Sequence, residues 1–485
     1  MTIFGAVAAL YGWRRTRLRA ADAIRRAPAG PIDIASRAAR TAEMAKLSGK
    51  IGAGAAVHQA QRVFASAGRK EVLDAAFQLR TAEQVAETLG SMKGALMKLG
   101  QMASYLDDAM PEPIREALAA LQSDAPPMAP ELAAQVVEQE LRAPPDQVFA
   151  TWDEVPIAAA SIGQVHRAMT HDGRAVAVKV QYPGVDRAIA SDLANTDLLM
   201  TAMGLIYPGL EAGPIVEELK ARLTEELDYT LEAEHQRRFA GFFAGHPFIH
   251  VPGVVDDLST RRVLTTELAS GARFSEIESW PQEEKDLAAE TIFRFVFRSL
   301  YRMHSFNGDP HPGNYLFTKG GQVTFLDYGL VKRFTVAETA LFERMIGSFV
   351  IERDHDRFRS ILEEIGMLVP GAPVSTEQVA DYFGYFYEMV MEQGAITITP
   401  EYASESVRQV FASGHPVTKH ANVPPAFVII QRINMGMYAI LGRLAATAPW
   451  RSIAEEMWPM IDGPPSTELG RAEQVWWDKA RRRKP

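Results

Sequence analysis

The sequence predicts an α+β protein in which a strand-rich segment precedes a mostly helical one. Short apolar runs typical of strands occur at residues 175–179, 263–268 and 323–326. Longer segments with helical periodicity lie at residues 81–105, 215–243, 288–304, 336–351 and 425–445. The chain has 485 residues, of which 47% are hydrophobic, so it is long enough for two or three domains with full-sized cores.

Proline clusters mark the predicted boundaries between these parts. Prolines at positions 126, 127, 130, 144 and 145 bracket one helix at residues 131–141, after an Ala-rich helical stretch. Another proline pair follows Gly463 near the end of the chain. We expect five parts: a basic and apolar segment (1–30), a helical extension (31–148), a strand-rich lobe (149–270), a mostly helical lobe (271–460) and a basic tail (461–485).

Two motifs have the residue types and order of a site for ATP and Mg2+. Lys179 ends a strand of alternating alanine and valine, where a rigidly held ammonium can bind the α- and β-phosphates. Asp309 and Asn314 share a Pro- and Gly-rich loop that can direct both side chains inward. We expect Asp309 to orient an attacking hydroxyl or water, and Asn314 to ligate Mg2+.

A third motif, Asp327-Tyr328-Gly329, follows the predicted strand at residues 323–326. Its glycine lets the chain turn sharply, and the Asp327 carboxylate is the expected second Mg2+ ligand. Lys179 alone is as well explained by a solvated charge at a strand end, but the three motifs occur in the order found in protein kinases. The sequence therefore predicts a protein-kinase-like, two-lobed fold with an added helical N-terminal extension.

The loop before Lys179 differs from the glycine-rich loop of a typical kinase. Residues 157–166 read IAAASIGQVH, so Ala158, Ala159, Ala160 and Ser161 take the place of flexible glycines. Each side chain disfavours positive φ and keeps the backbone farther from phosphate. We expect these residues to contact the nucleotide in a mode that differs from the usual one; a small-residue turn without function is the alternative.

An acidic cluster lies on the helix predicted at residues 215–243. Glu225, Asp228 and Glu232 recur at i, i+3 and i+7, on one helix face. Glu232 can therefore pair with Lys179, as the glutamate of a kinase αC helix does. Glu226 faces elsewhere unless the helix bends or begins nearby. A solvated acidic face is the alternative interpretation.

The strand at residues 263–268 is apolar and ends in a polar segment. In a kinase, the hinge follows such a strand, and its backbone forms hydrogen bonds with adenine. We therefore expect Glu267 to belong to the nucleotide-binding hinge.

A further motif, Lys98-Leu99-Gly100-Gln101, lies on the helix predicted at residues 81–105. Lys98 and Gln101 are three positions apart and share a helix face. Taken alone, the motif is typical of an ordinary amphipathic helix with an exposed lysine.

Together these motifs resemble the UbiB family, also called AarF, of atypical protein-kinase-like proteins. The resemblance is carried by KxGQ at 98–101, the Ala-rich loop at 158–163, VAxK at 176–179, ExD at 226–228, DPxxxN at 309–314 and DxG at 327–329. In the family, the KxGQ helix covers the face where kinases admit peptide substrates. The resemblance therefore implies ATPase activity or small-molecule phosphotransfer, with ordinary protein phosphorylation disfavoured.

The resemblance also implies that the KxGQ side chains reach toward the nucleotide and the ExD acids. On this basis Lys98 would act both in catalysis and in regulation, and the other regulatory residues would be Gln101, Glu226 and Asp228. Two positions depart from the family pattern: Asn307 stands where relatives commonly have histidine, and Tyr328 where they have phenylalanine. Neither change removes a group assigned to nucleotide or metal.

Charge and composition limit the partners. The net charge of −9 argues against general nucleic-acid binding, and the absence of cysteine excludes disulfides and thiolate metal sites. The termini are basic, with six arginines in the first 28 residues and a cationic cluster at residues 479–484 beside Trp476 and Trp477. Such ends suit an anionic membrane surface, and solvated termini are the alternative. The sequence contains no transmembrane candidate.

We therefore expect a cytoplasmic, Mg-ATP-dependent atypical kinase or ATPase, peripheral at the inner face of a membrane. By resemblance, it would support biosynthesis or handling of quinones or other isoprenoid lipids, with an isoprenoid lipid or quinone precursor as a partner. Two alternatives stay open. One is a pseudokinase scaffold that uses nucleotide as a switch, which the retained site residues disfavour. The other is a small-molecule kinase of the aminoglycoside-phosphotransferase type, a class that lacks the KxGQ helix and the Ala-rich loop.

Overall fold

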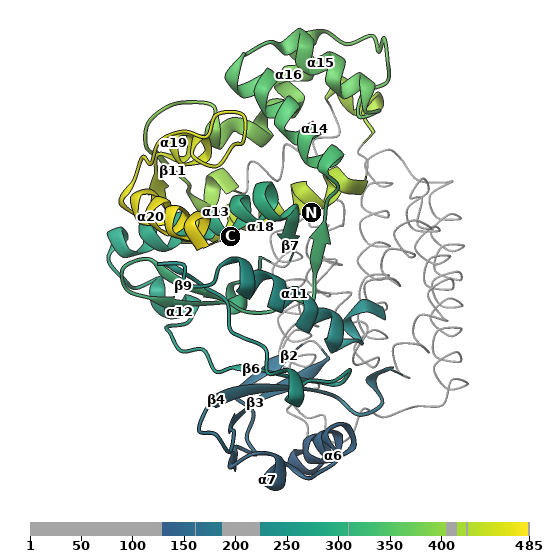
Figure 1. Ribbon diagram of the computed structural model, residues 1–485. Helices are drawn as coiled ribbons and strands as arrows, with labels where there is room; N and C mark the ends of the chain where they lie inside the picture. Colours follow the sequence, from purple (N-terminus) through teal and green to yellow (C-terminus); the bar gives the residue numbers. More distant parts are fainter. Residues whose placement is uncertain are drawn as a thin grey trace, which may run out of the picture. The chain divides into compact units, whose positions relative to one another are not determined.

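A computed structural model describes residues 129–160, 162–186, 224–308, 310–403, 415–422 and 425–483. Lys98, Gln101, Ser161, Asp309 and most of the predicted N-terminal extension lie outside these residues. The chain divides into two compact units, both drawn in Figure 1. The first includes the described residues up to 228 together with 256–265, and the second comprises 229–255 and the residues from 266 onward.

The first unit is built on a five-stranded sheet with the order β1-β3-β4-β6, in which β2 also pairs with β3. The strands are β1 (Thr151–Trp152), β2 (Ala158–Ala160), β3 (Gly163–Met169), β4 (Ala175–Gln181) and β6 (Val263–Glu267), the last of which crosses into the second unit. Helices α6 (Pro130–Leu141) and α7 (Pro145–Val148) precede the sheet. Val176, Val178 and Val180 of β4 are buried, and Val136 and Val137 of α6 are buried near that strand. The predicted strand ending near Lys179 and the predicted helix at 131–141 are thus confirmed.

The second unit surrounds the long helix α13 (Gln282–Met303), which packs on a three-stranded sheet with the order β5-β9-β8. Its strands are β5 (Ile249–His250), β7 (Ser305–Asn307), β8 (Tyr315–Thr318), β9 (Gln322–Phe325), β10 (Val331–Arg333), β11 (Ile396–Thr397) and β12 (Thr447–Ala448). Its other α-helices are α11 (Tyr229–Phe242), α12 (Phe274–Ile277), α14 (Val336–Ile346), α15 (His355–Glu364), α16 (Thr376–Gly384), α18 (Pro425–Arg443), α19 (Trp450–Glu455) and α20 (Glu468–Arg483). Helices α14, α15 and α16 are grouped at one end of this unit (Figure 1).

Aromatic side chains connect α13 to the sheet of the second unit. The ring of Phe295 on α13 stacks on Phe325 of β9 with centroids 3.7 Å apart, and it also contacts Phe239 of α11 at 5.6 Å. All three rings are buried. Because β9 leads directly into the DxG motif, this core supports the segment on which the site is built. Within the described ranges, no helix combines the length and apolarity needed to cross a membrane.

The helix predicted at residues 215–243 is interrupted in the structure. Residues 224–226 are helical, and α11 begins only at Tyr229. In between, the N–H groups of residues 227 and 228 donate to carbonyls three positions back, as in a 3₁₀ turn. The Leu227 carbonyl accepts the side-chain amide of Gln181 from β4 at 3.1 Å. The expectation that Asp228 and Glu232 share one regular helix face is therefore wrong, because a side chain from another strand takes the carbonyl at the break.

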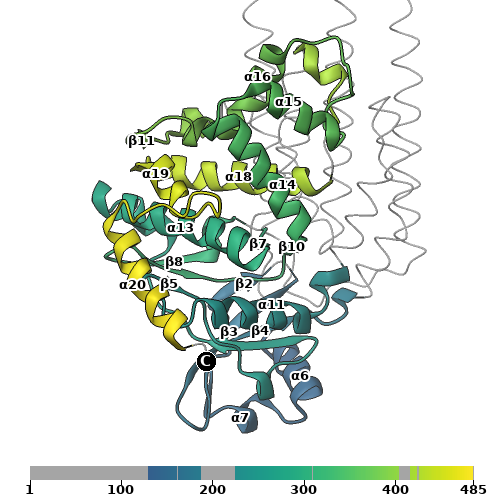
Figure 2. The ribbon, with the colours of Figure 1, turned by 45° about the horizontal axis from the view of Figure 1, so that its top comes forward.

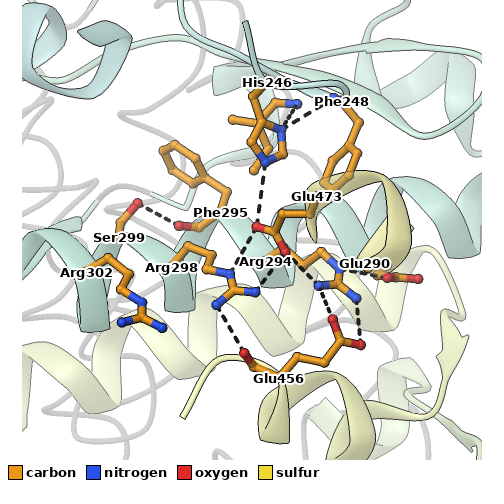
Figure 3. Close-up of polar contacts among 12 residues, drawn as sticks. His246, Phe248, Glu290, Arg294, Phe295, Arg298, Ser299, Arg302, Glu456 and Glu473 are labelled. Carbon is orange, nitrogen blue, oxygen red and sulfur yellow. Dashed lines mark hydrogen bonds and ion pairs between the residues drawn. The ribbon is translucent and has the colours of Figure 1, made fainter. Parts of the chain in front are cut away.

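A network of buried ion pairs holds the end of the chain to the second unit. Figure 3 shows Arg294 of α13, which is 0% exposed and donates to Glu290 (2.7 Å), Glu456 (2.8 Å) and Glu473 (2.8 Å). Arg298, one turn along α13, donates to Glu473 through Nε at 3.0 Å. Glu473 belongs to α20, which lies at the edge of this unit beside α13 (Figure 2). The stretch predicted as a basic tail thus contains a helix with a buried acid.

The environment of Glu473 shifts its titration strongly. Burial by itself raises the pKa of the Glu473 carboxyl, but the adjacent His246 ring and the charges of Arg298 and Arg294 outweigh burial and lower the pKa to about 2. The ionised carboxylate therefore stabilises the fold above its ordinary pKa of 4.5, and this contribution is lost as the pH falls toward 2. Burial raises the pKa of Glu290 in the same network, so acid acts on that residue in the opposite sense.

We predict that Glu473→Gln lowers the free energy of unfolding by about 3 kcal/mol at pH 7, because it leaves two buried guanidinium groups short of a counter-charge. The difference in the free energy of unfolding between wild type and variant should shrink as the pH is lowered from 4.5 toward 3. Denaturant unfolding of wild type and variant across this pH range measures the difference. Glu468→Gln, at an exposed position of the same helix, is the control. A difference that stays constant with pH would contradict the assigned role of Glu473.

Candidate nucleotide and metal site

The β8–β9 hairpin brings the two predicted metal ligands to one end of a sheet. The strands are antiparallel, and Tyr315 at the start of β8 pairs with Phe325 at the end of β9. The backbone N–H of Leu326 continues this ladder by donating to the Asn314 carbonyl at 2.8 Å. Asn314 thus lies beside the residue that precedes Asp327. The register therefore places Asn314 and Asp327 at neighbouring positions of the backbone.

A second strand pair holds the beginning of the DPxxxN loop against the exit of the DxG motif. In this pair Asn307 of β7 lies opposite Val331 of β10. Beyond it, the Gly308 N–H donates to the Leu330 carbonyl at 2.7 Å. Asp309 follows Gly308 directly but lies outside the described residues. Its predicted role in orienting the attacking group stays a prediction.

The backbone at Asp327 has a conformation that few residues adopt. Its φ is 55°, in the left-handed region, which costs a non-glycine residue on the order of 1 kcal/mol. Two hydrogen bonds hold the turn: Asp327 Oδ1 accepts the Gly329 N–H at 3.0 Å, and the Asp327 carbonyl accepts the Asn307 side-chain amide at 3.0 Å. The Asn307 side chain thus supports the turn by donating to it.

Helix α11 contacts the DxG turn through the side chains of Glu232 and His235. A methyl group placed on Gly329 would lie 3.3 Å from Asp327 Oδ1 and 3.7 Å from Glu232 Oε2, so both carboxylates flank this glycine. Glu232 is buried. One turn along the helix, His235 Nδ1 donates to the Tyr328 carbonyl at 3.2 Å. Two neighbouring carboxylates favour a cation beside them, which suits a site for Mg2+ and a lysine.

The hydroxyl of Tyr328 explains why tyrosine is tolerated in the DxG motif. The side chain is 0% exposed, and its ring packs 5.1 Å from Phe239 of α11. The hydroxyl donates to the Phe325 carbonyl at 3.3 Å. Burial raises the pKa of Tyr328 well above its usual value, so the phenol stays neutral and available as a donor. The extra oxygen is thus satisfied inside the core.

The strand register of the first unit places Ala158 of the Ala-rich loop and Lys179 on one face of the sheet, with Ala159 on the other face. Ala158 of β2 lies opposite Val165 of β3, which in turn lies opposite Lys179 of β4. Opposed residues point to the same face, so Ala158 is two strands, or about 10 Å, from the lysine. The opposite face carries the pair His166 and Val178, both 0% exposed. The loop is a tight hairpin in which β2 ends at Ala160 and β3 begins at Gly163.

Gln181 was not anticipated from the sequence, yet it links the ExD motif to the lysine strand. Its side chain is 1% exposed. The amide donates to the carbonyls of Leu227 (3.1 Å) and Arg261 (3.3 Å). Leu227 is the central residue of the motif, between Glu226 and Asp228. The hydrogen bond from Gln181 to Leu227 therefore ties this acidic turn to β4. Lys179 lies on the same strand, two residues before Gln181.

Glu267 lies at the end of β6, at the position predicted for the hinge. Its backbone N–H donates to the Gly253 carbonyl at 2.8 Å. Its side chain is exposed, with Oε2 3.5 Å from His250 Nε2. The Glu267 N–H is thus already used within the second unit, and contacts with adenine would need other backbone groups of the hinge.

Gly436 of α18 also supports the site, although it belongs to none of the sequence motifs. A methyl group at this position would lie 2.2 Å from Cγ of Pro310, so the loop residue packs directly on the helix backbone. The proline ring is rigid and immediately follows Asp309. Because only glycine allows this contact, α18 supports the loop that carries the predicted catalytic aspartate.

The residues of the second unit fit the requirements of a magnesium ion. Mg2+ prefers oxygen ligands and commonly takes one or two from protein, with the remainder from phosphates and water. The Asn314 amide oxygen and the Asp327 carboxylate are oxygen donors of this kind, and their residues lie at the end of one hairpin. Lys179 and these two candidate metal ligands belong to different units, so their joint action on one nucleotide remains a prediction.

Comparison with known proteins identifies the family. The model of the ABC1 atypical kinase-like domain matches residues 120–362, half of the chain. The chain belongs to this family. It is 34% identical over 278 residues to the mitochondrial atypical kinase COQ8B of Rattus norvegicus, covering 57% of this chain and 52% of that protein. It is 29% identical over 288 residues to the mitochondrial atypical kinase COQ8 of Saccharomyces cerevisiae, covering 59% and 57%.

A solved structure shows the same fold. It is the complex structure of Rv3197-erythromycin from Mycobacterium tuberculosis, with a TM-score of 0.59 and 30% identity, and it covers 81% of this chain and 100% of that one. The predicted membership of the UbiB family and the kinase-like fold are confirmed. The chain spans about half the length of the curated relatives it matches.

We predict that Gly436→Ala reduces nucleotide turnover by about tenfold or more, because the added methyl group must displace Pro310 and with it the loop. The fold should survive, since the site of the change is one helix–loop contact. Gly241→Ala is the matched control: it also replaces a helical glycine, but at an exposed position with nothing within 4 Å of the new group. Steady-state phosphate release measures the turnover of both variants, and thermal denaturation shows whether their folds are intact. Equal turnover in the two variants would show that the loop does not depend on α18.

Proposed function

We propose that this atypical kinase-like protein binds ATP with Mg2+ and transfers or hydrolyses the γ-phosphoryl group. The observation that carries the proposal is the β8–β9 register, which sets Asn314 beside the DxG turn. Asn314 and Asp327 would hold the metal, and Lys179 would bind the α- and β-phosphates. When bound, Mg2+ neutralises charge on the phosphates. Asp309 would orient the attacking oxygen of water or of an acceptor hydroxyl.

The names of the relatives support a role connected with quinones. The rat and yeast relatives are named COQ8B and COQ8, and both are described as mitochondrial atypical kinases. We propose that this chain supports the biosynthesis or handling of a quinone or another isoprenoid lipid, and that it acts at an anionic membrane surface on the cytoplasmic side. The basic segment at residues 1–28 would supply the contact with the membrane. A pseudokinase scaffold that only binds nucleotide is the alternative that the test below separates.

The KxGQ motif would restrain this chemistry. Lys98 and Gln101 lie outside the described residues, and their proposed role rests on the family resemblance. If Lys98 competes for acids near the phosphates, its removal changes nucleotide affinity. Glu226 and Asp228 are the acids proposed to meet it, in the turn that Gln181 holds.

We predict that ATP raises the melting temperature of the protein only when Mg2+ is present, because the metal bridges the phosphates to Asn314 and Asp327. Asp327→Asn should abolish this shift. Asp286→Asn, at an acid of α13 in the same unit, is a control for the loss of a carboxylate. The same shift with and without chelator would contradict the metal site. Stabilisation by Mg-ATP without any phosphate release would favour the scaffold.

A further inference from the structure

Helix α20 is fixed to the core by its first half. Glu473 is 1% exposed, and its carboxylate accepts hydrogen bonds from Arg294 and Arg298 of α13 at 2.8–3.0 Å (Figure 3). Charge-assisted bonds of this kind, buried and multiple, hold a helix in one position. The ion pairs of Glu473 therefore also fix the position of the residues that follow it on α20.

The second half of α20 rests on the end of α11. The Trp476 indole N–H donates to the Ala244 carbonyl at 3.1 Å. The rings of Trp476 and Trp477 lie 6.5 and 5.7 Å from Phe242, the last residue of α11. The sequence predicts these tryptophans at a membrane surface, but in the structure both are half-buried against their own chain.

His246 connects the two sets of contacts. Its Nδ1 accepts the backbone N–H of Ile249 at 3.1 Å, so the ring proton is on Nε2. That nitrogen faces Glu473 Oε1 at 3.6 Å, and the ring packs 4.6 Å from Trp476 (Figure 3 shows the His246–Glu473 contact). Glu473 and Trp476 therefore hold the turn between α11 and β5 from one side.

The stripe of α11 that ends at Phe242 also contacts the DxG turn. Glu232, His235 and Phe239 follow one another at i, i+3 and i+7, and they contact Gly329 and Tyr328. A helix of this length behaves as a rigid rod, so a displacement of its C-terminal end also moves the residues that contact the DxG turn. What holds the end of α11 also sets the place of the turn that contains Asp327.

We propose that Glu473 and Trp476 are positioning residues for the metal-binding turn, acting through α11. The step from the position of the turn to metal and nucleotide binding rests on the function proposed above. Loss of the α20 contacts should loosen α11 and the turn while the rest of the second unit stays folded.

Hydrogen–deuterium exchange on the full chain tests this without nucleotide. In Trp476→Ala and Glu473→Gln, amides of residues 326–331 should exchange at least about fivefold faster relative to those of α15, which serves as the internal reference for global unfolding. Trp476→Phe keeps a ring on the turn and should restore most of the protection. Glu290→Gln is the matched control, because it removes a buried carboxylate of the same network and leaves Glu473 and Trp476 in place.

The same variants are then titrated with Mg2+ at fixed ATP. Trp476→Ala should raise the Mg2+ concentration for half-maximal stabilisation by about fivefold, and Trp476→Phe by less. Unchanged exchange at residues 326–331 in both Trp476→Ala and Glu473→Gln, or an equal acceleration in Glu290→Gln, would overturn the proposal. If Mg-ATP does not stabilise the wild-type protein, the proposed function is refuted. The exchange rates of residues 326–331 would still decide the role of α20.

Discussion

The pairing of β8 with β9 is the constraint on which the candidate site depends. Tyr315 opposes Phe325, and Phe325 stacks on Phe295 of the central helix. A slip of one residue would turn Phe325 out of the core, so burial of that ring fixes the register. The register in turn sets Asn314 beside the DxG turn. A polar arrangement is thus held in place by an apolar contact a few residues away.

Around this hairpin, each part of the second unit fixes one side of the turn. Asn307 donates to the Asp327 carbonyl from β7, and His235 donates to the Tyr328 carbonyl from α11. Gly436 of α18 lies against Pro310 in the loop that contains Asp309. The backbone of Asp327 is held in a left-handed conformation, and the surrounding hydrogen bonds offset its cost. Strain of this kind persists only where several neighbours determine the same geometry.

Local patterns predicted much of this arrangement. The strand before Asp327 and the strand that carries Lys179 follow from short apolar runs, and the motif order predicted the kinase-like fold. The interruption at Leu227 could not be predicted, because the amide that accompanies it comes from Gln181 on a distant strand. The contacts of Trp476 could not be predicted either. The sequence of a helix with aromatic residues on one face is the same whether that face contacts a membrane or packs on its own chain. The contact of Gly436 with Pro310 leaves no periodic signal at all.

A crystal structure of the full chain with Mg2+ and a non-hydrolysable ATP analogue tests the proposed metal and nucleotide site most directly. We expect a metal ion within about 2.1 Å of the Asn314 amide oxygen and an Asp327 carboxylate oxygen, with phosphate oxygens completing its coordination. We also expect the ammonium of Lys179 on the α- and β-phosphates of the same nucleotide. A nucleotide bound elsewhere, or a metal held without both residues, would contradict the proposed site.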